Sequence, residues 1–170
     1  MPDLDQIPEI FEDVSNPLDS IEDMLSGNEW AFSRLNDEEL SVQVAGKRGQ
    51  YNLTFIWQDE YSAMQFFCEF DQTIPAARLD MACRVLRRIN ESLWLGHFDI
   101  SSRNSAPCFR HTSLFRGCTQ TSGAEHIEDL VDIALAESER FNNVFTMLAT
   151  ATDLTDDQLT FALSDAAGEA

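Results

Sequence analysis

The sequence predicts an α+β domain in which helices cover an antiparallel β-sheet. Three observations carry this prediction. Along the 170-residue chain the spacing of apolar residues changes from helical to alternating and back, turn-forming residues separate the alternating runs, and each expected helix has one apolar stripe. The expected order is helix, four strands, helix, two strands, helix. Sheets and helices with one apolar side each bury those sides against one another, which gives a layered α+β fold.

The first helix is expected over residues 17–26. Asn16 suits the N-cap position, Pro17 suits the first helical position, and Gly27 suits the C-terminal end. Residues 1–15 are acidic, and we expect them to form a mobile segment ahead of the domain.

Residues 30–70 then alternate between apolar and polar side chains, as half-buried strands do. Turn-forming residues interrupt this alternation three times. We therefore expect a four-stranded antiparallel meander, with strands near residues 30–34, 40–44, 51–58 and 64–70.

A second helix is expected after Pro75, with an inner apolar stripe that includes Cys83. Two strands follow this helix. Ser122 and Glu125 then form a capping-box pattern, which predicts a long third helix over residues 123–149.

The chain is expected to contain one α+β domain, over residues 16–149. Thr155 and Gln158 repeat the capping pattern and are expected to open a weak terminal helix, whose end SDAAGEA should fray. Residues 150–170 are therefore expected to be a weakly helical or disordered tail.

The stretch before the long helix contains His97, Cys108, His111 and Cys118, a set that raises the question of a metal or thiol site. Its alternation predicts a β-hairpin, in which His97 and His111 lie on opposite faces. Residues three apart on a strand, such as Cys108 and His111, also point to opposite faces and cannot bind the same ion. We therefore predict no metal site and no bound cofactor.

The apolar pattern also sets the expected register of this hairpin. Placing Ile100 opposite Phe109 keeps apolar side chains together on one face, and it places Asp99 opposite Arg110 as an ion pair.

The usual catalytic motifs are missing from the sequence. There is no Gly-rich phosphate loop, no H-E-x-x-H and no G-x-S-x-G. We therefore predict that the protein is not an enzyme. The alternative is a small enzyme or small-molecule binder that uses the sheet face carrying His97 and Asp99, or a thiol such as Cys83.

The net charge of −19 is concentrated at the two ends of the chain. Residues 1–40 carry twelve acids against one base, residues 123–170 carry eleven against one, and residues 41–122 carry seven against nine. Phosphate backbones and anionic membranes repel such a chain, so we expect no contact with nucleic acid or membranes, whereas a basic protein partner is compatible. The alternative is an acidic nucleic-acid mimic, which would need its acidic helices to form one stripe.

The expected location is the cytoplasm. The N-terminus is acidic where a secretion signal is basic and then apolar, and no run is apolar enough to span a membrane. The four cysteines form no C-x-x-C pair and lie among apolar residues, as free thiols in a reducing compartment do.

Five residues form the candidate partner surface. Ile56 and Phe67 stand among polar residues on the polar side of the expected sheet, for which the alternatives are a partner or dimer surface and cover by a helix of the same chain. Arg84, Arg87 and Arg88 form a basic cluster on the second helix, for which the alternatives are an acidic partner or ion pairs with the protein's own acidic helices.

The run RINESLWLGHFDISSRNSAPCFRHTSLF resembles the bacterial YbjN domain family of sensory transduction regulators, and the resemblance covers residues 17–148. It implies a fold similar to that of type III secretion chaperones, which are small acidic α+β proteins that dimerise and bind protein segments. It implies no catalytic residue and no cofactor. We therefore expect a chaperone-like or regulatory protein-binding homodimer. The matching positions are Asn90, Gly96, Phe98, Phe109 and Arg110.

Overall fold

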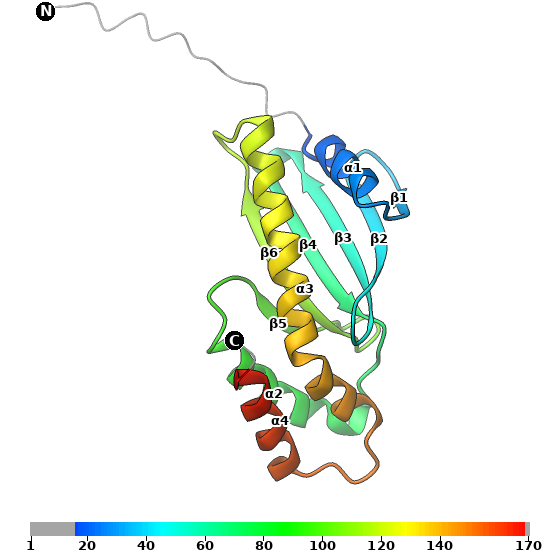
Figure 1. The fold of residues 1–170 in the computed structure, drawn as a ribbon, viewed down its shortest axis with the longest axis vertical. Coiled ribbons are helices and arrows are strands. Elements are labelled where there is room, and N and C mark those ends of the chain that lie inside the picture. Colours follow the sequence, from blue (N-terminus) through cyan, green and yellow to red (C-terminus); the bar gives the residue numbers. More distant parts are fainter. Residues whose placement is uncertain (1–15, 169–170) are drawn as a thin grey trace, which may run out of the picture.

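The computed structural model describes residues 16–168, which form a six-stranded antiparallel sheet with helices across one face (Figure 1). The strand order is β1-β2-β3-β4-β6-β5, so β4 and β6 join the meander and the later hairpin into one sheet. The predicted α+β class is confirmed. The expected acidic segment 1–15 lies outside the described residues. The strands are β1 Phe32–Arg34, β2 Glu39–Ala45, β3 Gln50–Gln58, β4 Ala63–Phe70, β5 His97–Ile100 and β6 Pro107–Leu114.

Helices α1 and α3 lie next to each other on the same side of the sheet, and α2 and α4 lie at the opposite end from α1 (Figure 1). The 31 residues of α3 extend for about 46 Å at a rise of about 1.5 Å per residue, so this helix runs along the whole sheet. The α-helices are α1 Leu18–Gly27, α2 Leu79–Asn90, α3 Gln120–Thr150 and α4 Asp156–Gly168, and single 3-10 turns occur at Asp59–Tyr61 and Ala76–Arg78.

The core lies between the sheet and these helices. Along β3 and β4 buried side chains alternate with half-buried ones, which confirms the alternation seen in the sequence. The Phe98 ring lies at the centre of the core and links the sheet to α3, with centroid distances of 5.3–6.2 Å to four other rings. Those rings belong to Phe70, Phe109, Phe141 and Phe145.

Helix α3 begins one turn before its expected cap. Thr119 is the N-cap, and its hydroxyl accepts a hydrogen bond from the Ser122 N–H at 3.2 Å. The Ser122 hydroxyl in turn accepts one from the Thr119 N–H at 3.0 Å. The prediction that Ser122 is the cap and Glu125 its partner was wrong, because a serine at the third helical position returns the bond as a glutamate would.

Helix α4 occupies the region where a weakly helical or disordered tail was expected. Thr155 and Gln158 make the expected reciprocal cap, with N–H bonds to the opposite side-chain oxygens at 3.0 and 3.3 Å. The Nε of Arg140 on α3 donates to the carbonyl of Ala166 at 2.8 Å. The helix therefore packs into the domain, and the expected boundary at residue 149 is too early. The buried residues of α4 are Leu159, Ala162, Leu163 and Ala166.

The β5–β6 hairpin has a register two residues away from the expected one. Phe98 pairs with Phe109, so Ile100 lies opposite Pro107. A shift of two residues keeps every side chain on its expected face, which is why the apolar pattern could not distinguish the two registers. The short loop that begins at Ser101 decides between them, since the Ser101 N–H donates to the Ala106 carbonyl at 2.9 Å.

Candidate functional site

The face of the sheet turned away from the helices, which we call the open face, contains a groove of about 550 Å³. Its lining comes from β2, β3, β4, β5, β6 and the loop after β5, and no helix of the described residues contributes to it. Both apolar residues predicted for the partner surface, Ile56 and Phe67, lie in this lining. The structure therefore brings these two together at a hollow site.

The pairing of β3, β4 and β6 places the residues at the centre of the groove in rows across the sheet. Thr54 on β3 lies opposite Phe67 on β4, and Phe67 lies opposite Arg110 on β6, so three side chains form a row across the sheet. Ile56 stands in the next row, opposite Gln65. Because Ile56 and Phe67 are only half-buried, apolar surface is exposed between polar neighbours.

Arg110 is held in place at the middle of this site. Its Nη1 donates to Asp99 Oδ2 at 2.9 Å, and its guanidinium carbon lies 5.2 Å from the centroid of the Phe67 ring. The expected ion pair of Asp99 with Arg110 is thus present, although Asp99 pairs across the strands with Cys108. Both side chains are partly exposed, so the pair orients Arg110 more than it stabilises the fold.

The loop after β5 forms one wall of the groove. Asn104 Nδ2 donates to Glu69 Oε1 on β4 at 2.8 Å, and Asn104 Oδ1 accepts from the Ala106 N–H at 3.2 Å. These bonds hold the loop against the open face. Neither Asn104 nor Glu69 was singled out by the sequence, because their meeting requires β6 to pair with β4.

Cys108 lies buried at the base of the groove, with 4% of its surface exposed. Burial raises the pKa of its thiol to about 12. A thiol with this pKa stays protonated at neutral pH, so Cys108 is a poor nucleophile. Burial likewise raises the pKa of Cys68 to about 12, on the helix side of the sheet.

The thiol alternative also named Cys83, which was expected on the inner stripe of its helix. The structure corrects this expectation: Cys83 is exposed, because α2 buries the neighbouring stripe that contains Val85 and Leu86. His126, a histidine outside the predicted hairpin, has its Nε2 2.9 Å from the Ser113 hydroxyl.

His97 and Asp99 formed the other catalytic alternative. The structure does not place both of them in the groove. Asp99 lines the groove and is bound to Arg110, whereas the exposed His97 is outside the lining. His97 and His111 lie on opposite faces as expected, since His97 pairs with the neighbour of His111. Within residues 16–168, no three His, Cys, Asp or Glu side chains are placed to hold a metal ion.

The three arginines of the candidate surface lie on α2, away from the groove lining. Arg84 and Arg88 face α4, where the Arg84 Nη2 lies 3.6 Å from Asp156 Oδ1 and the Arg88 Nη1 donates to Thr160 Oγ1 at 3.2 Å. Arg87 pairs with Glu91 on its own helix, at 3.4 Å. The predicted surface is therefore two separate regions, and its basic part contacts the acidic α4.

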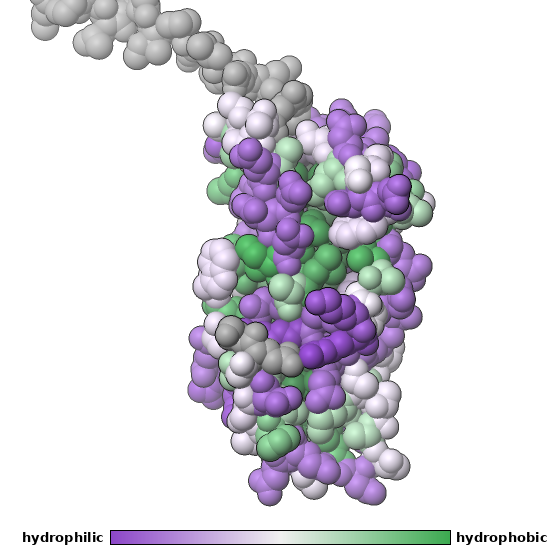
Figure 2. All heavy atoms as spheres, in the orientation of Figure 1, coloured by the Kyte–Doolittle hydropathy of each residue, from purple (hydrophilic) through white to green (hydrophobic). Residues whose placement is uncertain are grey.

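The helix side of the molecule is acidic at the end where α1 lies, and Figure 2 shows hydrophilic side chains along α1 and the first turns of α3. Asp23 of α1 and Glu125 and Glu128 of α3 line a common hollow of about 560 Å³. Acids of the two helices thus share one surface, an observation in favour of the nucleic-acid-mimic alternative. Across the described residues, each helix is too short or too polar to cross a bilayer.

Comparisons with known proteins found a family model and solved structures that are similar to this chain. Residues 17–147 match the YbjN family, described as "Putative bacterial sensory transduction regulator". One similar solved structure is the crystal structure of YbjN from E. coli, described as "a putative transcription regulator", with 14% identity and a TM-score of 0.48 over 74% of this chain and 93% of that one. No curated protein has significant similarity to the chain. Because the match to the family covers well over half of its residues, this chain belongs to the YbjN family.

Proposed function

We propose that this protein is a non-catalytic, cytoplasmic regulator that binds proteins, and that it forms a homodimer through its open face. The observation that carries the proposal is the groove in which Ile56 and Phe67 remain half-buried among polar groups. An exposed apolar patch with a polar rim is typical of an interaction surface. The description of the family as a sensory transduction regulator supports a regulatory role.

The charges at the groove favour a second copy of the chain as its occupant. In a two-fold interface the same patch comes from both subunits, so a patch that carries both signs of charge can be complementary to itself. The helix side is strongly acidic and would repel its own copy, whereas the groove is nearly neutral. Its charged residues are the acids Glu39, Glu69 and Asp99 and the bases Arg103 and Arg110.

The state of the polar groups in the groove supports binding rather than catalysis. The Cys108 thiol has a pKa of about 12, and the Asp99 carboxylate is bound to Arg110. A nucleophile or general base has to be unprotonated and free to reach a substrate. Neither group meets this requirement, so the groove offers a shaped surface without an activated residue.

Analytical ultracentrifugation tests the dimer. We expect the wild type to have twice the chain mass of 19.2 kDa at micromolar concentration, and Phe67→Glu to be a monomer because it buries a charge at the centre of the interface. Phe67→Ala, which removes apolar area without adding charge, should raise the dimer dissociation constant about tenfold or more.

Phe161→Glu is the matched control, since it introduces the same charge at an exposed phenylalanine on the helix side. It should leave the dimer intact. A wild type that is monomeric at all concentrations, or a Phe67→Glu variant that dimerises like the wild type, would contradict the proposal.

The alternative of a small-molecule binder has one observation in its favour, the groove volume of about 550 Å³, which lies within the range of about 300–1,000 Å³ for ligand sites. A ligand in this groove would bind the monomer and compete with dimer formation. Dimer formation that is unaffected by Phe67→Ala, together with a small molecule that protects Ile56 from solvent, would favour this alternative.

A further inference from the structure

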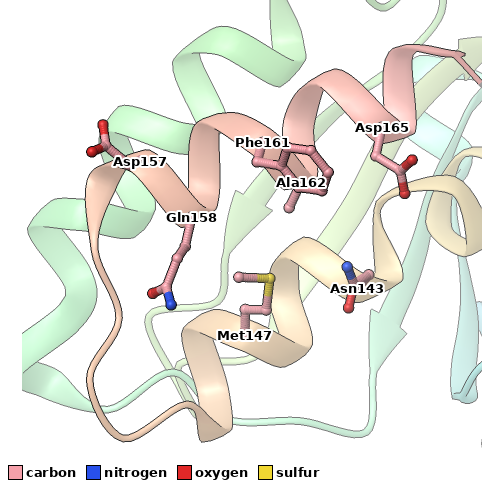
Figure 3. A pocket seen from close by; sticks show the side chains of 7 residues that line it. All are labelled: Asn143, Met147, Asp157, Gln158, Phe161, Ala162 and Asp165. Atoms are coloured by element: carbon pink, nitrogen blue, oxygen red, sulfur yellow. The ribbon is translucent and has the colours of Figure 1, made fainter.

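Helices α3 and α4 form a second groove, of about 350 Å³, on the other side of the molecule from the open face. Figure 3 shows Met147 of α3 pointing toward α4, and Phe161 and Ala162 of α4 lying above it. Within this groove Phe161 is 76% exposed, whereas Ala162 beside it is buried. A single exposed phenylalanine is ordinary on a protein surface, so the inference depends on what surrounds it.

Two acids lie on the same stripe of α4 as Phe161. Asp157 is four residues before it and Asp165 four residues after it, and both line the groove. Residues four apart lie above one another on a helix, so the stripe presents an apolar ring between two carboxylates that are about 12 Å apart. In Figure 3 the two aspartates stand at the two ends of the groove.

The lining of the groove carries only negative charge, because Asp157 and Asp165 are its two charged residues. Residues 141–168 include four acids and no Lys, Arg or His. Bases of other elements lie outside this lining: Arg84 is 3.6 Å from Asp156, and Arg48 shares a neighbouring hollow with Asp165. Both Asp157 and Asp165 are exposed, so a partner can reach them.

We infer that the α3–α4 groove is a docking site for a basic helical protein segment that carries one apolar side chain between two Lys or Arg residues. The apolar side chain would lie against Phe161, Met147 and Ala162, and the two bases would reach Asp157 and Asp165. A helix with bases four residues before and after its apolar residue has the same spacing of about 12 Å, which makes the two stripes complementary. The inference rests on the proposed function only in taking the protein to be a protein binder.

The charge of the groove excludes other occupants. Nucleic acid and anionic lipid would bring phosphates against two carboxylates. A second copy of this chain docked groove to groove would bring the same two carboxylates against Asp157 and Asp165. A basic segment is the one class of partner that both the apolar and the charged parts of the groove attract.

The test uses the full chain and a labelled, alanine-based helical peptide with a central leucine and lysines four residues before and after it. Its counterpart has glutamates in place of the lysines. We expect the lysine peptide to bind in a fluorescence anisotropy titration at low salt, with binding that weakens as salt is added, and the glutamate peptide not to bind.

Three variants locate the binding. Phe161→Ala should lower the affinity about tenfold or more, because it removes the apolar anchor. Asp157→Asn and Asp165→Asn should each lower it about two- to fivefold at low salt, as expected for exposed ion pairs. The control is Asp129→Asn, which removes the same charge from an exposed position of α3 outside the groove.

Several results would overturn the inference: no binding of the lysine peptide, equal binding of both peptides, or equal affinity of Phe161→Ala and the wild type. Loss of dimer in Phe161→Ala would also overturn it, because the occupant would then be a second copy. The dimer of the proposed function is measured separately with Phe67→Ala, which should bind the peptide like the wild type. Failure of the peptide docking therefore does not imply failure of the dimer, and failure of the dimer does not imply failure of the docking.

Discussion

At the scale of single residues, two positions beside β5 each require a particular residue type, a glycine at Gly96 and an asparagine at Asn90. Gly96 has a φ of 65°, and a Cβ there would lie 2.3 Å from Cζ of the Phe109 ring. The Asn90 side chain donates to the Phe98 carbonyl at 3.0 Å and accepts from the Phe98 N–H at 2.7 Å. The Asn90 side chain thus makes the two hydrogen bonds that another strand would make at the outer edge of β5. This protects the edge from pairing with another chain.

Replacing Gly96 by alanine should destabilise the domain strongly. The left-handed backbone costs a non-glycine residue about 1–2 kcal/mol, and displacing the buried Phe109 ring adds about 1–3 kcal/mol. We expect the free energy of unfolding in urea to fall by about 2–5 kcal/mol in total.

Gly27→Ala is the matched control for Gly96→Ala. Gly27 is the last residue of α1, and a Cβ there would have no neighbour within 4 Å. Alanine in a helix is neutral or slightly stabilising relative to glycine. Equal losses of stability in the two variants would contradict the role given to Gly96.

The buried thiols predict how stability depends on alkaline pH. Burial raises the pKa of Cys68 and of Cys108 from 9.0 to about 12 in the folded protein. A raised pKa means that the stabilisation is fully present below about pH 9 and is lost as the pH rises toward 12, because the unfolded chain ionises first. Unfolding measured between pH 9 and 11 should show this loss.

Cys108→Ala should reduce the slope of stability against pH by about one proton, independently of the constant loss from the smaller side chain. Val85→Ala, which shortens a buried side chain that cannot titrate, is its control and should leave the slope unchanged. If both variants keep the slope of the wild type, the burial of the Cys108 thiol does not govern its titration.

At the scale of elements, local patterns predicted the strands and most of the helices, and they failed where long-range contacts decide. The alternation along β3 and β4 is a direct consequence of one buried face, so it could be predicted. The start of α4 could be predicted from its capping pattern, but its packing into the domain could not, because its buried stripe includes two alanines and becomes part of a core only against α3. The hairpin register likewise depends on a loop that apolar patterning does not describe.

Leu159→Ala tests whether α4 belongs to the folded domain. Leu159 is buried, so its truncation should lower the free energy of unfolding by about 2–4 kcal/mol. Phe161→Ala on the same helix is the control, and it should change stability by less than about 0.5 kcal/mol because the ring is exposed. A Leu159→Ala variant as stable as the wild type would indicate a dispensable tail.

At the scale of the whole molecule, charge and apolar surface are divided between faces. Acids of α1 and α3 line a common hollow on the helix side, and the open face carries a nearly neutral groove with partly exposed apolar side chains. Ile56 and Phe67 could be predicted as part of this site, because they interrupt the polar side of two adjacent strands. The ion pair of Asp99 with Arg110 could be predicted too, whereas the contact of Arg110 with Phe67 could not, because the pairing of β4 with β6 spans about 45 residues of sequence and leaves no local pattern.

The central claim is that a second copy of the chain covers the open face. Methyl NMR of isoleucine-labelled protein, followed through a dilution series, tests it most directly. We predict that the methyl signal of Ile56 shifts as the dimer dissociates, while those of the buried Ile89 and Ile127 on the helix side stay in place. An Ile56 signal that does not change over a range in which the mass falls from dimer to monomer would contradict the claim.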